Sequence, residues 1–469
     1  MAESELCFLS ATELAAKLRA RELSAREVME AHLQQIAAVN PKVNAIVTLV
    51  AERAMAEADA ADEALAHGAE VGALHGLPIA HKDLFATRGI RTTQGSKIMA
   101  DFVPTEDAPV VAREKAAGAI TVGKTNTPEF GAGSQTYNDV FGETRNPYDL
   151  SKTCGGSSGG AAVALATGMV PLADGTDTGG SLRNPANFCN VVGFRTTPGL
   201  VGHARWSTLD VAGPMGRSVA DVALLLSVQA GFDPRSPLTQ HIDGAVFRQP
   251  LDRDLRGVRV AWSRDLGGLP VDPRVTAVLE LQRETLVGLG CEVEDIDPPL
   301  DGADEIFETF RAHNMALVLE PLYDEYRREM KPTLTWNIEE GLKLSSADLR
   351  QAERRRAILS TRMRQFMERY EVVACPVNQV PPFPVEQRYI TEICGQPMAT
   401  YIEWMRSCSR ISATGHPAVS VPAGFTAEGL PVGIQFVGRY RDELALLKFA
   451  HAFEGATGFG RRRPGVGGT

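Results

Sequence analysis

Short apolar segments recur along this chain, and they constrain its fold more than any other feature. Each is rich in β-branched residues and is bounded by Gly or Pro, as buried strands are. The segments are LPIAH (77–81), GAITVG (118–123), GMVPLA (168–173), VRVAWS (258–263), CEVEDI (291–296), EVVACPV (371–377) and LPVGIQFVG (430–438). Helix-like stretches separate several of them, which predicts an α/β fold with a mixed sheet covered by helices on both faces.

The N-terminal part of the chain is predicted to be helical. Ser10 with Glu13, and Ser24 with Glu27, have the spacing of a capping box, in which a hydroxyl and a carboxylate satisfy exposed amides at a helix N-terminus. Residues 51–67 are rich in Ala and Glu and predict a further helix.

The composition changes along the chain without marking a domain boundary. Residues 142–216 are crowded with Gly, Ser, Thr, Asn and Pro, which is typical of a functional region in a compact enzyme. A charged stretch at about 300–412 predicts a helical variable region, and the tail at about 460–469 is predicted to be disordered. No repeat or low-complexity linker divides the chain, so we expect a single domain over residues 1–469.

The overall composition excludes several classes of protein. The chain has 469 residues with 48 basic and 58 acidic side chains, a net charge of −10, which argues against a nucleic-acid surface. No basic segment precedes an apolar run at the N-terminus, and no stretch approaches the ~18 apolar residues of a membrane span. The seven cysteines contain no CxxC pair, so we expect reduced thiols and no metal site. These features predict a cytoplasmic enzyme that binds neither nucleic acid nor membrane.

Two short motifs match known patterns without their expected surroundings. Residues 118–125, GAITVGKT, fit the phosphate-loop pattern, but their central Ala-Ile-Thr-Val is typical of a strand and Pro128 follows where a helix should continue. Residues 156–160, GSSGG, fit the nucleophile elbow around Ser158, but loop-like residues precede them where an elbow requires a strand. We therefore expect a buried strand in the first case and no elbow nucleophile in the second.

A third interpretation accounts for more of the sequence. The segments GLPIAHKDLF (76–85), TCGGSSGGAA (153–162) and DGTDTGGSLRNPA (174–186) occur in this order. Together they resemble the amidase signature family. The resemblance extends to GKTNTPEFG (123–131), VVGFRTTPG (191–199), TGHPAVSVPAG (414–424) and LPVGIQFVG (430–438). It implies a single α/β/α layered domain with a mixed central β-sheet and a signature core at about 76–216.

The resemblance implies a catalytic triad of Lys82, Ser157 and Ser181. In that pattern Ser181 is the nucleophile and Ser157 follows a cis peptide bond. The residue chemistry supports this assignment, because a Ser hydroxyl is a weak nucleophile without an adjacent base and these motifs hold no consistent His partner. A Lys acts as a base only when neutral, and burial among apolar neighbours lowers its pKa.

The binding roles also follow from the resemblance. Amides around Thr178, Gly179 and Gly180 are expected to hold the oxyanion. Gly131 is expected to lie near the acyl side of the pocket, where its missing side chain leaves room for a bulky group.

The surroundings of the triad contain one expected ion pair and two unusual residues. Asp177 and Arg183 match an acidic and a basic position of the family motif and are expected to pair and support the oxyanion loop. Cys154 stands where family members often carry Pro, which predicts a less rigid loop, and no motif supports this thiol as a nucleophile. His81, beside Lys82, is also unusual and receives no role.

The predicted function is hydrolysis of a small-molecule carboxylic amide through a seryl acyl-enzyme, with no metal or organic cofactor. Aryl acylamides are included among the expected substrates, and a homodimer is left open. Three alternatives remain: the glutamine-hydrolysing subunit of a tRNA-dependent amidotransferase, an esterase or carbamate (urethane) hydrolase with the same triad, and a non-catalytic binding protein. The aromatic residues expected to shape the pocket are Trp336, Tyr401 and Trp404.

Overall fold

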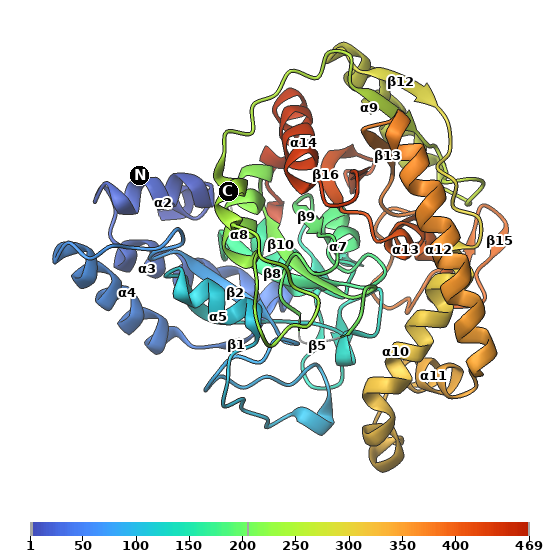
Figure 1. The fold of residues 1–469 in the computed structure, drawn as a ribbon. Helices are drawn as coiled ribbons and strands as arrows, with labels where there is room; N and C mark the ends of the chain where they lie inside the picture. Colours follow the sequence, from blue (N-terminus) through green and yellow to red (C-terminus); the bar gives the residue numbers. More distant parts are fainter. Residues whose placement is uncertain (1–2, 204–205, 468–469) are drawn as a thin grey trace.

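The computed structural model describes residues 3–203 and 206–467, and this part of the chain is built around a large mixed sheet (Figure 1). In spatial order, the eleven strands of this sheet among the described residues are β1 (Ile46–Leu49), β3 (Ile120–Thr125), β2 (Pro78–Lys82), β8 (Leu172–Asp177), β10 (Val211–Gly216), β9 (Val192–Arg195), β16 (Ala418–Phe425), β17 (Pro431–Val437), β13 (Val372–Pro376), β11 (Arg259–Trp262) and β12 (Glu292–Asp295). β2 is parallel to β3 and β8, and β11 is parallel to β12 and β13, whereas the other neighbours are antiparallel. The predicted mixed sheet is confirmed, and the single domain over residues 1–469 stays a prediction.

The apolar segments coincide with strands, with one shift. Six of the seven lie on β2, β3, β11, β12, β13 and β17, but GMVPLA contributes only its last two residues to β8. The strand starts at Leu172, directly after Pro171, because Pro has no N–H to donate to a strand ladder.

The GAITVGKT segment forms the buried strand β3, as predicted. All six residues of β3 are buried. Lys124 Nζ donates to Thr87 Oγ1 over 2.7 Å, to Thr92 Oγ1 over 3.2 Å and to the carbonyl of Phe85. This ammonium therefore holds the segment that follows β2.

Helices form the N-terminal part of the chain, as predicted. They are α1 (Glu3–Leu6), α2 (Ala11–Arg19), α3 (Ala25–Val43) and α4 (Ala51–Ala66). Both capping boxes are present, since Ser10 and Ser24 each accept from the amide three residues on and the glutamates reach back to the cap.

Helices cover both faces of the sheet. Every residue of β2, β3 and β17 is buried, as in strands that are covered on both sides. In β16, Val419 and Val421 belong to the apolar cluster that includes Phe449, whereas Ser420 lies on the side of Asn187. Phe449 belongs to α14 (Glu443–Thr457) and Asn187 to α7 (Arg183–Phe188). The helices around the sheet also include α5 (Pro109–Ala116), α6 (Gly159–Ala166), α8 (Val219–Gln229), α9 (Pro273–Gly288) and α13 (Arg406–Thr414).

The variable region is helical over only part of its predicted length. α10 (Ala303–Tyr326), α11 (Pro332–Leu342) and α12 (Ser346–Arg369) lie at one side of the sheet, in gold and orange in Figure 1. Beyond Arg369 the chain enters β13, because residues 372–376 are apolar and fill an interior position of the sheet. No helix among the described residues is both long and apolar enough to cross a membrane.

Short elements connect these parts of the fold. Three two-stranded ladders pair β4 (Tyr137–Asn138) with β5 (Gly142–Glu143), β6 (Arg145–Asn146) with β7 (Asp149–Thr153) and β14 (Glu392–Ile393) with β15 (Gln396–Pro397). The 3-10 helices among the described residues are η1 (Lys97–Met99), η2 (Glu129–Gly131), η3 (Gly244–Arg248), η4 (Glu403–Met405), η5 (Phe459–Arg461) and η6 (Gly465–Gly467).

The C-terminal segment is packed through its described residues, which corrects the prediction of a disordered tail at 460–469. The Tyr148 hydroxyl donates to the carbonyl of Arg462 over 2.6 Å. The guanidinium groups of Arg462 and Arg463 each lie 4.0 Å from a ring centroid, that of Phe425 and that of Phe8. Aromatic faces from distant parts of the chain therefore contact these two exposed arginines. Residues 468–469 lie outside the described residues.

Candidate active site

Lys82 is the last residue of β2, and its side chain is fully buried. Its Nζ donates to Ser157 Oγ over 2.7 Å, to Ser158 Oγ over 2.9 Å and to Thr176 Oγ1 over 2.8 Å. Burial lowers the pKa of Lys82 to about 7, although two carboxylates on β8 raise it. A substantial fraction of this amine is therefore neutral near pH 7, as a general base requires.

Ser157 and Ser158 lie in the loop that leads into α6. The peptide bond between Gly156 and Ser157 is cis, as the resemblance implies. β7 ends at Thr153, so a loop and not a strand precedes Ser158. Ser158 is fully buried and bonds to the lysine, an arrangement unlike that of a nucleophile elbow.

Ser181 lies in a turn between β8 and α7, and Asp177 holds this turn on both sides of it. The amide of Gly180 donates to Asp177 Oδ1 over 2.9 Å, and that of Leu182 donates to Oδ2 over 3.2 Å. Among the described residues, no hydrogen bond joins the Ser181 and Ser157 hydroxyls. The structure thus joins Lys82 to Ser157 directly, and the Ser181 segment is joined to the serine loop by a hydrogen bond of 3.2 Å from the Ser158 N–H to the Ser181 carbonyl.

The turn requires glycine at two positions. A Cβ at Gly179 would lie 2.6 Å from the ring of Phe307, and Gly180 has a φ of 122° and would meet Cys408 at 2.6 Å. The Gly180 N–H already has the Asp177 carboxylate as its acceptor, in contrast to its predicted oxyanion role.

Asp177 is fully buried between two arginines. Arg183 donates to its two carboxylate oxygens over 3.0 and 2.9 Å, and Arg195 Nη1 donates to Oδ1 over 3.0 Å. Burial raises the pKa of Asp177, but the guanidinium groups outweigh this effect and hold the pKa well below its usual range. Arg183 also donates to the carbonyl of Cys408 over 3.1 Å and to Ser412 Oγ over 2.8 Å. The predicted Asp177–Arg183 pair is thus part of a larger buried cluster.

We expect Arg195→Met to lower the free energy of unfolding by about 1–3 kcal/mol, because Arg183 still pairs with Asp177 while the buried carbonyls of Asp177 and Leu209 lose their donor. Urea unfolding at pH 7, followed by circular dichroism, measures the change. Arg256→Met is the matched control, since the Arg256 side chain is 82% exposed and its pairing with Asp254 is at the surface. Equal unfolding midpoints for the two variants would contradict the prediction.

A pocket of about 700 Å³, including its open mouth, lies beside Ser157. Gly131 lies in its wall, where an added Cβ would stand 3.8 Å from Ser157 Oγ and 2.8 Å from Leu84. The residues that line it are Leu84, Phe85, Gln94, Phe130, Gly131, Ser157, Thr176, Thr178, His203, Asp210, Arg311, Asn314 and Met315.

The variable region (about 300–412) lines this pocket, but not through the aromatic residues that were predicted. Trp336, Tyr401 and Trp404 are absent from its described lining. Trp404 is fully buried and stacks on Phe188 at a centroid distance of 6.2 Å, so it belongs to the core. The region reaches the pocket instead through Arg311 and its neighbours on α10.

Cys154 is fully buried at the start of the serine loop. Its Sγ donates to the carbonyl of Thr144 over 3.3 Å. Burial raises the pKa of this thiol to about 12, so it is not a reactive thiolate.

Several groups at the site were not predicted. Thr176 is the third partner of Lys82, and its place inside the DGTDTGGS motif was an available signal. Arg195 lies within the VVGFRTTPG motif, but nothing in that motif marks its contact with Asp177. Asp210 and Arg311 face the pocket from outside every quoted motif.

Comparison with known proteins identifies the family. Residues 27–447 match the amidase family. The chain belongs to this family. As a member, this amidase is a hydrolase that acts on the carbon–nitrogen bond of amides.

Individual relatives resemble this amidase over its whole length. A glutamyl-tRNA(Gln) amidotransferase subunit of Moorella thermoacetica is 36% identical over 99% of each chain. The acylamidase of Rhodococcus erythropolis is 35% identical over 99% of this chain and 98% of the relative. The crystal structure of a bacterial aryl acylamidase of the amidase signature family superposes with a TM-score of 0.91 at 27% identity, covering 97% of this chain and 99% of the other. The predicted family and fold are confirmed.

Proposed function

We propose that this amidase cleaves small-molecule amides through a seryl acyl-enzyme, with Ser181 as nucleophile, Ser157 as proton relay and Lys82 as base. The observation that carries the proposal is the buried contact of 2.7 Å between Lys82 Nζ and Ser157 Oγ. The lowered pKa of Lys82, about 7, supports the role of a base that is neutral at working pH. The hydrogen bond of 3.2 Å from the Ser158 N–H to the Ser181 carbonyl, which joins the two serine segments, supports the inclusion of Ser181.

Acylation moves two protons and forms one bond. Lys82 Nζ takes the proton of Ser157 while Ser157 Oγ takes that of Ser181, and Ser181 Oγ bonds to the carbonyl carbon. The carbonyl oxygen becomes negative, and we assign its stabilisation to the amides of Thr178, Gly179 and Ser181. The carbon–nitrogen bond then breaks as the proton on Lys82 returns through Ser157 to the leaving nitrogen.

Deacylation runs the same relay with water. Lys82 and Ser157 remove a proton from a water molecule, which attacks the ester carbon of the acyl-enzyme. The bond to Ser181 Oγ breaks, the proton returns to Ser181, and the carboxylic acid leaves. Each residue of the relay ends in its starting state.

Full-length similarity to an acylamidase and an aryl acylamidase supports an acylamide as the substrate of this chain. Because the chain is also 36% identical to an amidotransferase component, the second candidate is the glutamine-hydrolysing subunit of such an enzyme. We propose a small-molecule amide as the substrate. The homodimer stays a prediction.

A substrate panel on the purified chain tests this choice. We expect aryl and alkyl amides to be hydrolysed by the lone chain, with kcat/KM values measured against matched esters, carbamates and glutamine. Glutamine hydrolysis that begins only when amidotransferase partner subunits are added would favour the second candidate. Larger kcat/KM values for esters or carbamates, relative to their uncatalysed rates, would favour an esterase or urethane hydrolase.

Chelators are expected to leave this activity intact, because the proposed relay uses only protein side chains. Activity is measured after overnight dialysis against EDTA and again after zinc is added. A loss in EDTA that zinc reverses would contradict the proposed mechanism.

A further inference from the structure

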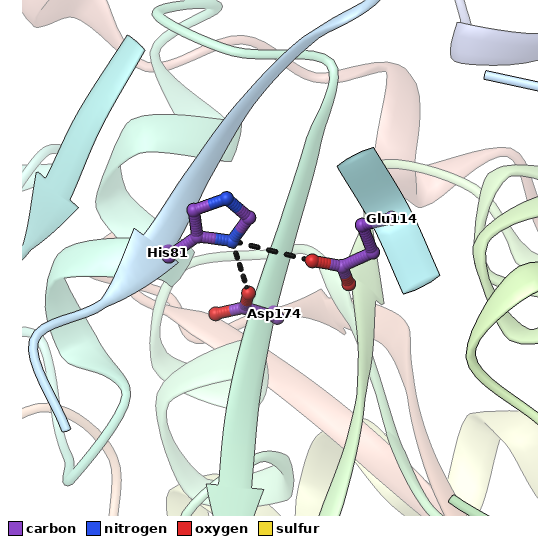
Figure 2. Close-up of side chains that lie close together, drawn as sticks. All are labelled: His81, Glu114 and Asp174. Carbon is purple, nitrogen blue, oxygen red and sulfur yellow. Dashed lines mark hydrogen bonds and ion pairs between the residues drawn. The ribbon is translucent and has the colours of Figure 1, made fainter. Parts of the chain in front are cut away.

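A buried polar cluster lies next to Lys82 and has no part in the proposed relay. It consists of His81 on β2, Glu114 on α5 and Asp174 on β8, and Figure 2 shows the imidazole edge facing both carboxylates. His81 Nδ1 lies 2.6 Å from Asp174 Oδ2 and 3.2 Å from Glu114 Oε2. All three side chains are fully buried. Because carboxylate oxygens accept hydrogen bonds, Nδ1 between them carries a proton.

Asp174 connects this cluster to the base. One of its oxygens binds His81, and the other accepts the backbone N–H of Lys82 over 2.7 Å. The same carboxylate therefore holds the end of β2 that carries the lysine and places a negative charge near its amine. That charge raises the pKa of Lys82 and opposes the effect of burial.

We propose that Asp174 and His81 are positioning residues for the base: Asp174 fixes the strand end that carries Lys82, and the imidazolium of His81 screens the Asp174 charge from the Lys82 amine. This inference rests on the proposed function, in which Lys82 must lose a proton to act. It gives a role to the unusual histidine of the motif.

The state of His81 supports this screening. Burial lowers the pKa of His81, but Asp174 and Glu114 outweigh burial and raise it to about 9, so the imidazole is cationic at neutral pH. On the other side of the ring, His81 Nε2 lies 3.0 Å from Thr121 Oγ1, a hydroxyl that accepts as readily as it donates.

Other charged groups near the base have charged or polar partners of their own. The charges of Lys124 on β3 and of Asp83, directly after β2, each favour the ionised form of the other. Asp177 pairs with Arg183 and Arg195, and its charge still raises the pKa of Lys82, so the effect of Asp174 adds to that of Asp177. On α5, burial and Asp174 raise the pKa of Glu114, which weakens its negative charge, and Gln229 of α8 donates to it over 2.7 Å. Among the described residues, His81 is the cationic side chain that bonds Asp174.

The distances favour a shared proton over a metal ion in the cluster. The donor atoms of His81, Glu114 and Asp174 lie within 4.8 Å of one another, as ligands would. A tetrahedral zinc with bonds of about 2.0–2.1 Å would hold two ligand atoms about 3.3 Å apart. The 2.6 Å between His81 and Asp174 is instead a hydrogen-bond distance.

The pH dependence of kcat/KM for an amide separates this role from a structural one. His81→Gln exposes the Asp174 charge and should move the acidic limb to higher pH by about one unit, with about 10-fold lower activity below its midpoint. Asp174→Asn removes that charge and should move the limb in the opposite direction, and the double variant should return toward the wild-type midpoint. His32→Gln is the matched control, because His32 is equally buried and its ring bonds the backbone carbonyl of Val28. The acidic limb of this variant should stay at the wild-type pH.

Measurements on the wild-type protein keep the inference testable if the variants fail to fold. Nitrogen-15 NMR of labelled histidine should show a charged His81 through pH 8, and a neutral imidazole at pH 7 would overturn the inference. One equivalent of bound metal in the wild type that His81→Gln loses would also overturn it. If Lys82→Ala abolishes the limb while His81→Gln and Asp174→Asn leave it in place, this inference fails alone; a limb that survives in Lys82→Ala rejects the proposed function.

Discussion

Ser181→Ala is expected to abolish acyl-enzyme formation and to lower kcat/KM by about five orders of magnitude, as removal of a nucleophile from a coupled unit does. Asp177 holds the turn through the amides of Gly180 and Leu182, so the substitution removes the hydroxyl and leaves the backbone in place. Intact-mass spectrometry after brief mixing with an activated amide, and labelling with a fluorophosphonate, both report the covalent adduct. Neither should detect one in the variant.

Ser158→Ala is the matched control for this prediction. Its hydroxyl also contacts the lysine, over 2.9 Å, but Ser158 is fully buried, whereas Ser181 is 7% exposed. We expect its loss to lower kcat/KM by only about 10-fold, as for one supporting hydrogen bond. An inactive Ser158→Ala together with an active Ser181→Ala would show that the nucleophile is Ser158.

Lys82→Ala is expected to remove most of the activity and the whole acidic limb of the pH profile. A base acts only when unprotonated, so wild-type activity should rise with pH and reach a plateau in the alkaline range. The free side chain has a pKa near ~10.4, and burial lowers that of Lys82 to about 7, so the midpoint should lie well below the free value. The measured midpoint belongs to the coupled Lys–Ser–Ser unit.

Lys82→Arg separates a base from a structural cation. Arginine retains the positive charge but does not deprotonate in this range, so this variant should fail as badly as the alanine variant. Thermal unfolding of both variants checks that the fold persists. Near-normal turnover in Lys82→Arg would show that the lysine is a structural cation and that another group is the base.

The sequence patterns predicted those parts of the sheet whose residues are apolar. β3 and β17 were predicted because both faces of each strand are covered. β10 was not, since its sequence, VAGPMG, contains Gly and Pro. A Cβ at Gly213 would lie 2.4 Å from the carbonyl oxygen of Phe194, so close approach to the neighbouring strand selects this glycine. Such a requirement depends on the partner strand and leaves no apolar pattern.

In the candidate site too, the residues of local motifs were predicted and those brought together by tertiary packing were not. Ser157, Ser181 and Lys82 lie in motifs whose spacing is visible along the chain. Hydrogen bonds join Lys82 to Ser157 and the Ser158 N–H to the Ser181 carbonyl. His81 and Asp174 are 93 residues apart, and only the parallel pairing of β2 with β8 brings them into contact. The side chain of Arg311 reaches the pocket through the packing of α10, which no local pattern encodes.

The buried clamp on the Ser181 turn has a consequence for the time at which activity arises during synthesis. Arg183, which binds the Asp177 carboxylate under this turn, precedes its other partners by more than 200 residues in the sequence. Those partners are the carbonyl of Cys408 and the hydroxyl of Ser412, which belong to α13. A nascent chain that ends after α12 contains every residue of the proposed relay and none of these anchors. We therefore expect a nascent chain to gain the proposed activity only after α13 has been synthesised, because the Ser181 turn lacks these anchors until then.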